Sequence, residues 1–230
     1  MNKIAIITAR GGSKRIPHKN MKHFCGKPIL AYSIEAALES KVFDEVMVST
    51  DSDAIAKVAL KYGAEVPFRR SAETADDYST TNNVLLEVLD EYEKRGRKFE
   101  VACCIYPTAP FVTANRLAEA VASLKSRKAD VVMPVTVFSY PPQRGLIQNE
   151  DGSVEMALPQ YMNTRSQDLK KIYHDCGQYY VFDVEAFRKQ KNIMQGKIWP
   201  MVVSELEMQD IDNESDWILA EIKYKQFMER

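Results

Sequence analysis

Two short stretches of the chain carry side chains whose types and spacing could perform chemistry. The first, ARGGSKRIPHKN (residues 9–20, the basic loop), places two glycines among Arg10, Lys14, Arg15 and Lys19. Glycines let backbone N–H groups approach an anion closely, and the cations can neutralise several charges of a polyphosphate. The patterns G-x-x-x-x-G-K-[ST] and G-x-G-x-x-G are absent. The loop therefore predicts a phosphate cradle outside the ordinary P-loop and dinucleotide-binding classes; the alternative is a solvated basic turn.

The second stretch, QDID (residues 209–212, the acidic segment), carries two carboxylates separated by Ile211. In a strand, alternate residues face the same way, so Asp210 and Asp212 can share one face while Ile211 enters the core. Mg²⁺ binds hard oxygen ligands, often one or two carboxylates together with phosphate and water. The alternative is that these acids only favour the positive end of a helix that begins near Asn213. We expect the pair to bind Mg²⁺.

The other reactive residue types exclude several enzyme classes. Histidine occurs only at positions 18, 23 and 174, which excludes a His-rich zinc site, and no G-x-S-x-G motif marks a hydrolase. Cys176 lies two residues after His174, and we interpret it as a structural thiol rather than a nucleophile. The four cysteines form no C-x-x-C pair, which favours the reduced thiols of a cytoplasmic protein.

The distribution of charge indicates a local anionic ligand. The chain of 230 residues has a net charge of −1, which argues against general nucleic-acid binding. The first 34 residues nevertheless hold seven Lys and Arg and no acid. RNA binding by this end is the alternative, but no aromatic residues accompany a basic face. No signal peptide and no apolar run of membrane-spanning length is visible, so we expect no membrane contact.

Strand-like and helix-like segments alternate along most of the chain. The apolar pattern predicts strands at 3–9, 44–50, 64–68, 101–106, 130–138, 178–183 and 201–207. It predicts helices at 28–40, 52–63, 82–95, 114–127, from about 184, and at 214–228. This alternation predicts an α/β three-layer sandwich, with helices on both faces of a mostly parallel, Rossmann-like sheet. Cys103 and Cys104 should then point to opposite faces of one strand.

Three polar stretches follow predicted strands, and one region interrupts the pattern. The basic loop, STDS (49–52) and PTAP (107–110) each lie at a strand's carboxyl end, so they should line one crevice. Between 140 and 176 the alternation stops, and NEDG (149–152) signals a hairpin. We expect a single domain over 1–230, with residues 140–176 (the arm) as a partner-binding excursion or a lid.

ARGGSKRIPHKN closely resembles the opening signature of the CMP-nonulosonic acid synthetases, the cytidylyltransferases that activate sialic acid and its bacterial relatives. Further matches follow in the family's order: STDS, FRRSAETADDYST (68–80), YPTAPFV (106–112) and DIDNESDW (210–217). They cover almost the whole chain. The resemblance implies a nucleotide-diphospho-sugar transferase-like fold, CTP as nucleotide, Mg²⁺ as cofactor, and a homodimer joined by the arm.

The resemblance also implies roles for individual residues. The implied nucleotide-binding residues are Ala9, Arg10, Gly11, Gly12, Ser13, Lys14, Lys19, Asn20, Arg70 and Ser79. The implied catalytic residues are Arg10, Lys14, Lys19 and Asp212, and the implied metal ligands are Asp210 and Asp212. The implied sugar-binding residues are Tyr106, Arg165 and Gln167. The chain departs from the family pattern at Ser71, Tyr106 and Val112, where Pro, Gln and Arg are usual.

The motifs YPPQR, RSQDL and YHDCG are most similar to the branch of the family that uses pseudaminic acid. This similarity implies conversion of CTP and pseudaminic acid to CMP-pseudaminic acid and pyrophosphate, for bacterial surface glycans or flagellin. Tyr106 in place of Gln would suit the terminal methyl group of pseudaminic acid. Sialic and legionaminic acids are alternative substrates. A nucleotide-binding regulatory module without catalysis is the alternative from another class, which the presence of both aspartates disfavours.

Overall fold

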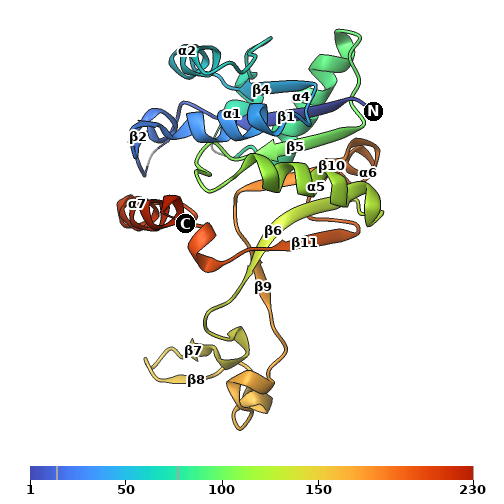
Figure 1. The fold of residues 1–230 in the computed structure, drawn as a ribbon. Helices are drawn as coiled ribbons and strands as arrows, with labels where there is room; N and C mark the ends of the chain where they lie inside the picture. The colour runs from blue at the N-terminus through green and yellow to red at the C-terminus, as the bar shows by residue number, and fades with distance from the viewer. Residues whose placement is uncertain (14, 77, 230) are drawn as a thin grey trace.

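The computed structural model describes residues 1–13, 15–76 and 78–229, and one mixed sheet forms its centre (Figure 1). The strand order is β11-β6-β10-β5-β1-β4, and β9 pairs with the carboxyl end of β6. The strands of this sheet are β1 (Lys3–Thr8), β4 (Glu45–Ser49), β5 (Val101–Ile105), β6 (Val131–Val137), β9 (Tyr173–Asp175), β10 (Tyr179–Asp183) and β11 (Ile198–Val202). The prediction of a largely parallel sheet is confirmed, with two antiparallel strands added to it.

The antiparallel strands are β9, at the end of the arm, and β10, which follows the arm. β1 runs parallel to β4 and β5, and β11 runs parallel to β6. β9 and β10 instead run antiparallel to their neighbours. A parallel pair needs a crossover connection, usually a helix, whereas an antiparallel strand can return directly. Because the arm leaves after β6 and comes back beside it without a crossover helix, the returning chain enters the sheet in the opposite direction.

Helices cover both faces of the sheet. The helices are α1 (Ile29–Ser40), α2 (Asp53–Lys61), α3 (Ala72–Ala75), α4 (Thr81–Lys94), α5 (Ala114–Ser126), α6 (Val184–Gln190) and α7 (Glu214–Met228). One apolar cluster joins α1, α2 and α5 to one face, and a second joins α4 and α6 to the other. Cys103 lies in the first cluster and Cys104 in the second, so the predicted alternation is confirmed. The molecule is therefore a three-layer α/β sandwich.

Most helix positions follow local signals, but two predicted strands are wrong. Of the segment 64–68, only Glu65 pairs with the sheet, by a bridge to Met47, because Pro67 then lacks the N–H that a longer ladder needs. The strand predicted at 201–207 is β11, which ends at Val202. A capping box between Ser204 and Glu207 then starts the 3-10 helix η5 (Glu205–Glu207).

The arm stands away from the sheet in Figure 1. It contains 3-10 helices η2 (Pro142–Arg144), η3 (Pro159–Tyr161) and η4 (Ser166–Asp168), and the hairpin of β7 (Leu146–Gln148) and β8 (Val154–Met156). The turn falls at NEDG as predicted, where Gly152 has a positive φ of 87°. Apolar side chains of this hairpin are exposed at Leu146, Ile147 and Val154.

A third apolar cluster joins the basic loop to the acidic segment. It brings together residues of β2 (His23–Phe24), α1 and α7. The 3-10 helix η1 (Lys19–Met21) precedes β2, which pairs with β3 (Lys27–Pro28). Ile16 of the basic loop and Ile211 of the acidic segment are both fully buried in this cluster. None of the helices in the described residues combines the length and apolar character that a membrane span requires.

We expect Ile211→Ala to destabilise the protein by about 2–5 kcal/mol, because truncation leaves a cavity between the two functional stretches. Urea unfolding, followed by fluorescence of the buried Trp217, measures this change. The control is Ile222→Ala on α7, whose side chain is 58% exposed. Equal midpoints for the two variants would contradict the role of Ile211.

Candidate active site

A cleft of about 410 Å³ lies at the carboxyl ends of β1 and β5. Its lining residues are Thr8, Arg10, Ser13, Arg15, Lys19, Asn20, Tyr106, Pro107 and Thr108. The basic loop and the PTAP stretch thus share one crevice, as predicted from the strand ends. STDS does not line the cleft among the described residues; it lies behind the basic loop. Lys14 lies outside the described residues.

STDS braces the start of the basic loop. The backbone N–H of Ala9 donates to the Ser49 carbonyl at 3.0 Å, and the N–H of Gly11 donates to Asp51 Oδ1 at 2.9 Å. A Cβ on Gly11 would lie 3.2 Å from Ser52 Cβ, so a side chain there would force a shift. The N–H of Gly11 is therefore engaged by a carboxylate, which corrects the expectation that it is unpaired and open to phosphate. A Cβ on Gly12 would meet nothing within 4 Å.

Asn20 closes the basic loop on itself. Its side chain is buried, and its Nδ2 donates to the Arg10 carbonyl at 2.9 Å. The Arg10 guanidinium donates to the Asp76 carbonyl at 3.1 Å, which connects the basic loop to the segment 71–80. Because one end of the loop is bonded to the other, its cationic side chains are directed at a common space rather than spread over the surface.

The acidic segment lies against the basic loop beside the cleft, and neither Asp210 nor Asp212 is among the described residues that line it. Arg15 Nη2 donates to Asp212 Oδ1 at 2.7 Å, and Lys19 Nζ donates to the Ile211 carbonyl at 2.6 Å. Burial lowers the pKa of the Lys19 ammonium, and the carboxylates of Asp212 and Asp210 oppose that shift. The geometry therefore brings together the two charged stretches that the sequence singled out.

The acidic segment is not a strand, yet its side chains alternate as they would in one. The segment has no strand partner because Asp216 Oδ2 accepts the N–H groups of Asp212 and Asn213, at 2.9 and 3.0 Å. Those bonds begin α7. Ile211 still points into the core while the aspartates on either side point out.

The acidic pair suits a hard divalent cation. Burial raises the pKa of Asp210, and the neighbouring Asp212 carboxylate raises it further. A cation between these carboxylates would relieve that repulsion. In the part of the chain that is described, no three His, Cys, Asp or Glu side chains are grouped to hold a metal ion. Two carboxylates beside a phosphate-sized basic cleft fit Mg²⁺, which takes its other ligands from phosphate and water.

The residues expected at the sugar are divided between two places. Tyr106 lies in the cleft, where its hydroxyl is 3.4 Å from Thr81 Oγ1 and burial raises the pKa of its phenol. Arg165 and Gln167 lie on the arm, away from the cleft of their own chain (Figure 1). Arg165 Nε donates to Asp168 at 2.8 Å. One chain alone does not bring these three residues together.

Arg70 and Ser79 support the cleft from outside its lining. Arg70 is buried, and its guanidinium donates to the hydroxyl and carbonyl oxygens of Ser49 at 3.1 and 2.7 Å. Ser79 donates its N–H to Asp76 Oδ1 at 2.6 Å. Neither belongs to the described residues that line the cleft. Both stabilise backbone that touches the basic loop, at Ser49 and at Asp76.

Sequence reasoning missed some of the polar surroundings of the acidic pair. Asp175 accepts hydrogen bonds from the Tyr180 hydroxyl and from the Gly177 N–H, and its charge raises the pKa of Asp210. The motif YHDCG contained it, but nothing local distinguished this acid. Burial raises the pKa of the adjacent Cys176 thiol to about 12, which agrees with a structural role. Thr8 and Thr108 also line the cleft without having been singled out.

A basic cleft at the strand ends of a three-layer α/β fold is typical of nucleotide-binding enzymes. The family model described as Cytidylyltransferase matches residues 4–215. The chain therefore belongs to the cytidylyltransferase family, and it is a nucleotidyltransferase.

Two curated relatives and one solved structure illustrate the similarity. The chain is 38% identical over 225 residues to the pseudaminic acid cytidylyltransferase of Campylobacter jejuni, covering 98% of this chain and 97% of the relative. It is 32% identical over 222 residues to the CMP-N,N'-diacetyllegionaminic acid synthase of Legionella pneumophila, covering 96% and 95%. The structure of CMP:2-keto-3-deoxy-manno-octonic acid synthetase complexed with CTP matches with a TM-score of 0.69, at 14% identity and 100% coverage of both chains. This structure shows the fold alone, and it confirms the predicted nucleotidyltransferase-like architecture.

Proposed function

We propose that the protein transfers CMP from CTP to pseudaminic acid, giving CMP-pseudaminic acid and pyrophosphate. The observation that carries this proposal is the basic cleft with a pair of carboxylates beside it, where Arg15, which lines the cleft, contacts Asp212 at 2.7 Å. A relative 38% identical over nearly the whole chain is a pseudaminic acid cytidylyltransferase, which supports this nonulosonic acid over its relatives. Legionaminic and sialic acids are the alternative substrates.

The basic loop is the proposed site of the triphosphate. Arg10, Ser13 and Lys19 line the cleft with cationic and hydroxyl donors for phosphate oxygens. Asn20 uses its Nδ2 to hold the Arg10 carbonyl, which leaves its Oδ1 to accept a hydrogen bond from the cytosine amino group. Lys14 and Gly12 complete the proposed nucleotide-binding set, with a backbone contribution from Ala9. Gly11 contributes only to the shape of the loop, because its N–H is bonded to Asp51.

Asp210 and Asp212 would hold Mg²⁺. The bound ion supplies positive charge to the phosphate oxygens. In this structure Arg15 forms an ion pair with Asp212. The Arg15 side chain is 67% exposed and the Asp212 side chain is 43% exposed. Such a pair is weak, so Arg15 can exchange the carboxylate for a phosphate when the nucleotide binds.

Residues of this chain would promote the reaction mainly by position and charge. The anomeric hydroxyl of the sugar acid attacks the α-phosphorus in line, and pyrophosphate leaves. Arg10, Lys14 and Lys19 offset the charge that grows on the leaving group. Lys19 is preorganised for this role because its ammonium is fixed on the Ile211 carbonyl at 2.6 Å.

The arm of a second copy would complete the sugar site. Arg165 and Gln167 lie far from their own cleft, yet a guanidinium is the natural partner of the sugar carboxylate. The exposed apolar side chains of the arm would become buried against another chain. We therefore propose a homodimer in which Tyr106 of one chain and Arg165 of the other contact one sugar.

With CTP and Mg²⁺, we expect pyrophosphate release to be fastest with pseudaminic acid, compared with legionaminic and sialic acids at equal concentrations. A coupled pyrophosphate assay measures the three kcat/KM values. Preference for another nonulosonic acid would change the assigned substrate. CTP binding without turnover on any of the three would instead favour a regulatory nucleotide-binding module.

We expect Asp212→Ala to lower kcat by roughly 10²-fold at saturating Mg²⁺, since it removes a principal site of charge stabilisation. The same pyrophosphate assay measures the loss. Glu214→Ala is the matched control, because Glu214 is a nearby acid that only pairs with Lys22 on the surface. A loss below about tenfold for Asp212→Ala would count against its role as a metal ligand.

Arg165→Ala should chiefly weaken the affinity for the sugar acid. Complementation between two variant chains can show whether Arg165 serves the cleft of its own chain or that of the other chain. A purified heterodimer of one Arg165→Ala chain and one Asp212→Ala chain should recover about half of wild-type activity, since one of its two shared sites is intact. The converse control pairs a wild-type chain with a chain carrying both substitutions, and it should stay inactive. Activity in the control but not in the first heterodimer would mean that each arm serves its own cleft.

A further inference from the structure

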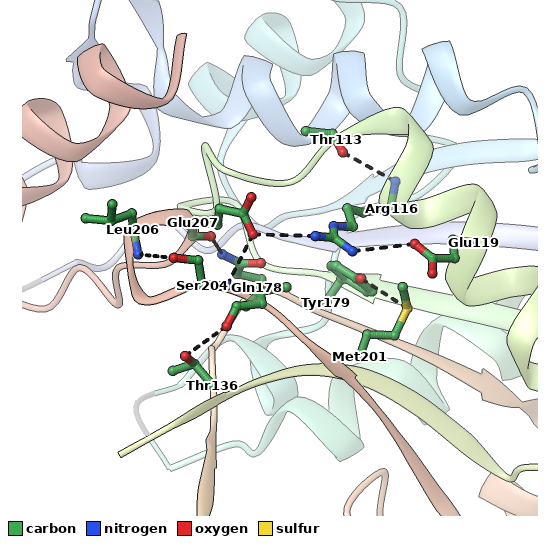
Figure 2. Close-up of polar contacts among 11 residues, drawn as sticks. Thr113, Arg116, Glu119, Thr136, Gln178, Tyr179, Met201, Ser204, Leu206 and Glu207 are labelled. Carbon is green, nitrogen blue, oxygen red and sulfur yellow. Dashed lines mark hydrogen bonds and ion pairs between the residues drawn. The ribbon is translucent and has the colours of Figure 1, made fainter. Parts of the chain in front are cut away.

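Residues 203–208 (the bridging segment) connect β11 to the acidic segment. The bridging segment lies beyond the strand, whose pairing with β6 ends where the Val203 N–H donates to the Val135 carbonyl. Its remaining order comes from the 3-10 helix η5 and from side chains of other elements (Figure 2). The first of these is Thr136, whose buried hydroxyl donates to the Val203 carbonyl at 3.0 Å. A segment with so few ladder bonds depends on such contacts for its position.

Gln178 links the bridging segment to the floor of the cleft. Its side chain is 4% exposed, and its Nε2 donates to the Glu207 carbonyl at 2.8 Å (Figure 2). The backbone carbonyl of the same residue accepts the N–H of Tyr106 at 2.8 Å. One residue therefore sets the distance between Tyr106, which lines the cleft, and the chain that leads to Asp210.

The Glu207 carboxylate is held as well. It accepts the Ser204 N–H at 3.2 Å and forms an ion pair at 3.5 Å with Arg116, which reaches it from α5 (Figure 2). Arg116 is also paired with Glu119 of its own helix at 3.5 Å. These contacts fix the bridging segment to the helical layer as well as to the sheet.

Lys223 holds the same segment from the last helix. From α7, its ammonium donates to the carbonyls of Glu205 and Met208, each at 3.1 Å, and to Gln209 Oε1 at 3.0 Å. An ammonium has three donors, and all three are directed at this short stretch of chain. The third acceptor is the residue immediately before Asp210.

We propose that Gln178 and Lys223 are positioning residues for the acidic pair. They hold the bridging segment from the sheet and from α7, so that Asp210 and Asp212 keep their places beside the basic loop despite their mutual repulsion. Neither residue needs to touch substrate; both act through backbone within a few residues of the aspartates. This inference rests on the proposed binding of a divalent cation by Asp210 and Asp212, and it deepens that proposal by naming what holds the ligands in place.

The test uses Gln178→Met and Lys223→Met, which keep side-chain length and remove the donors. Mn²⁺ binding is measured by electron paramagnetic resonance, in the presence of a CTP analogue with a methylene bridge between the α- and β-phosphorus. We expect each variant to weaken Mn²⁺ binding by roughly tenfold or more, as loss of a ligand's support does. Affinity for the analogue without metal should stay unchanged. The matched controls, Gln195→Met and Lys197→Met, lie on an exposed loop and should bind Mn²⁺ normally.

Amide hydrogen exchange gives a second readout that does not depend on the metal. The amides of residues 204–212 should exchange faster in Gln178→Met and Lys223→Met than in the controls, while those of β1 and β5 stay protected. Lys223 lies on the surface helix α7, so its variant remains informative if loss of the buried Gln178 amide prevents folding.

Two results would overturn the proposal. The first is Mn²⁺ affinity and exchange equal to the controls; the second is an equal loss of metal-free analogue binding, which would mean a general structural role. Asp212→Asn separates this proposal from the proposed function. If it leaves Mn²⁺ affinity unchanged, the metal site itself is wrong and the positioning role falls with it. If it weakens Mn²⁺ binding while Gln178→Met and Lys223→Met do not, only the positioning role is wrong.

Discussion

The site depends on holding a basic and an acidic stretch face to face, although Arg15 and Asp212 are 197 positions apart in the chain. Their ion pair is largely exposed, and exposed pairs contribute little free energy. The contact between the two stretches is stabilised instead by Ile16 and Ile211, which are buried in one apolar cluster beneath the charged groups. Because apolar burial supplies the stability, the charged groups above it remain free to exchange partners when a polyphosphate binds.

The surrounding fold supplies rigid walls for this arrangement. The neighbouring strands β1 and β5 deliver the basic loop and the PTAP stretch to the same edge of the sheet. Asp51 and Asn20 fix the shape of the loop through backbone atoms and leave its cations directed at the cleft. A preorganised set of charges needs little rearrangement during phosphoryl transfer, which is how such sites stabilise a transition state.

The arm has a different role, since it carries Arg165 and Gln167, the residues proposed for the sugar acid, away from the sheet of its own chain. The chain departs from the sheet after β6 and returns antiparallel to it, so it carries Arg165 outward on an apolar hairpin. A second chain that buried this hairpin would couple assembly to completion of the site. Specificity for the sugar acid would then depend on residues of both chains, Tyr106 and Arg165 among them.

The sequence by itself determined the α/β class, most elements and the charged stretches, because these follow from local signals. The helix predicted at 214–228 is α7, since Asn213 caps it with a bond to the next turn. Only the tertiary structure decided the antiparallel direction of β10 and the engagement of the Gly11 N–H by Asp51. Each of these depends on a hydrogen-bond partner that is distant in the sequence. The residues next to it in the chain do not determine which partner that is.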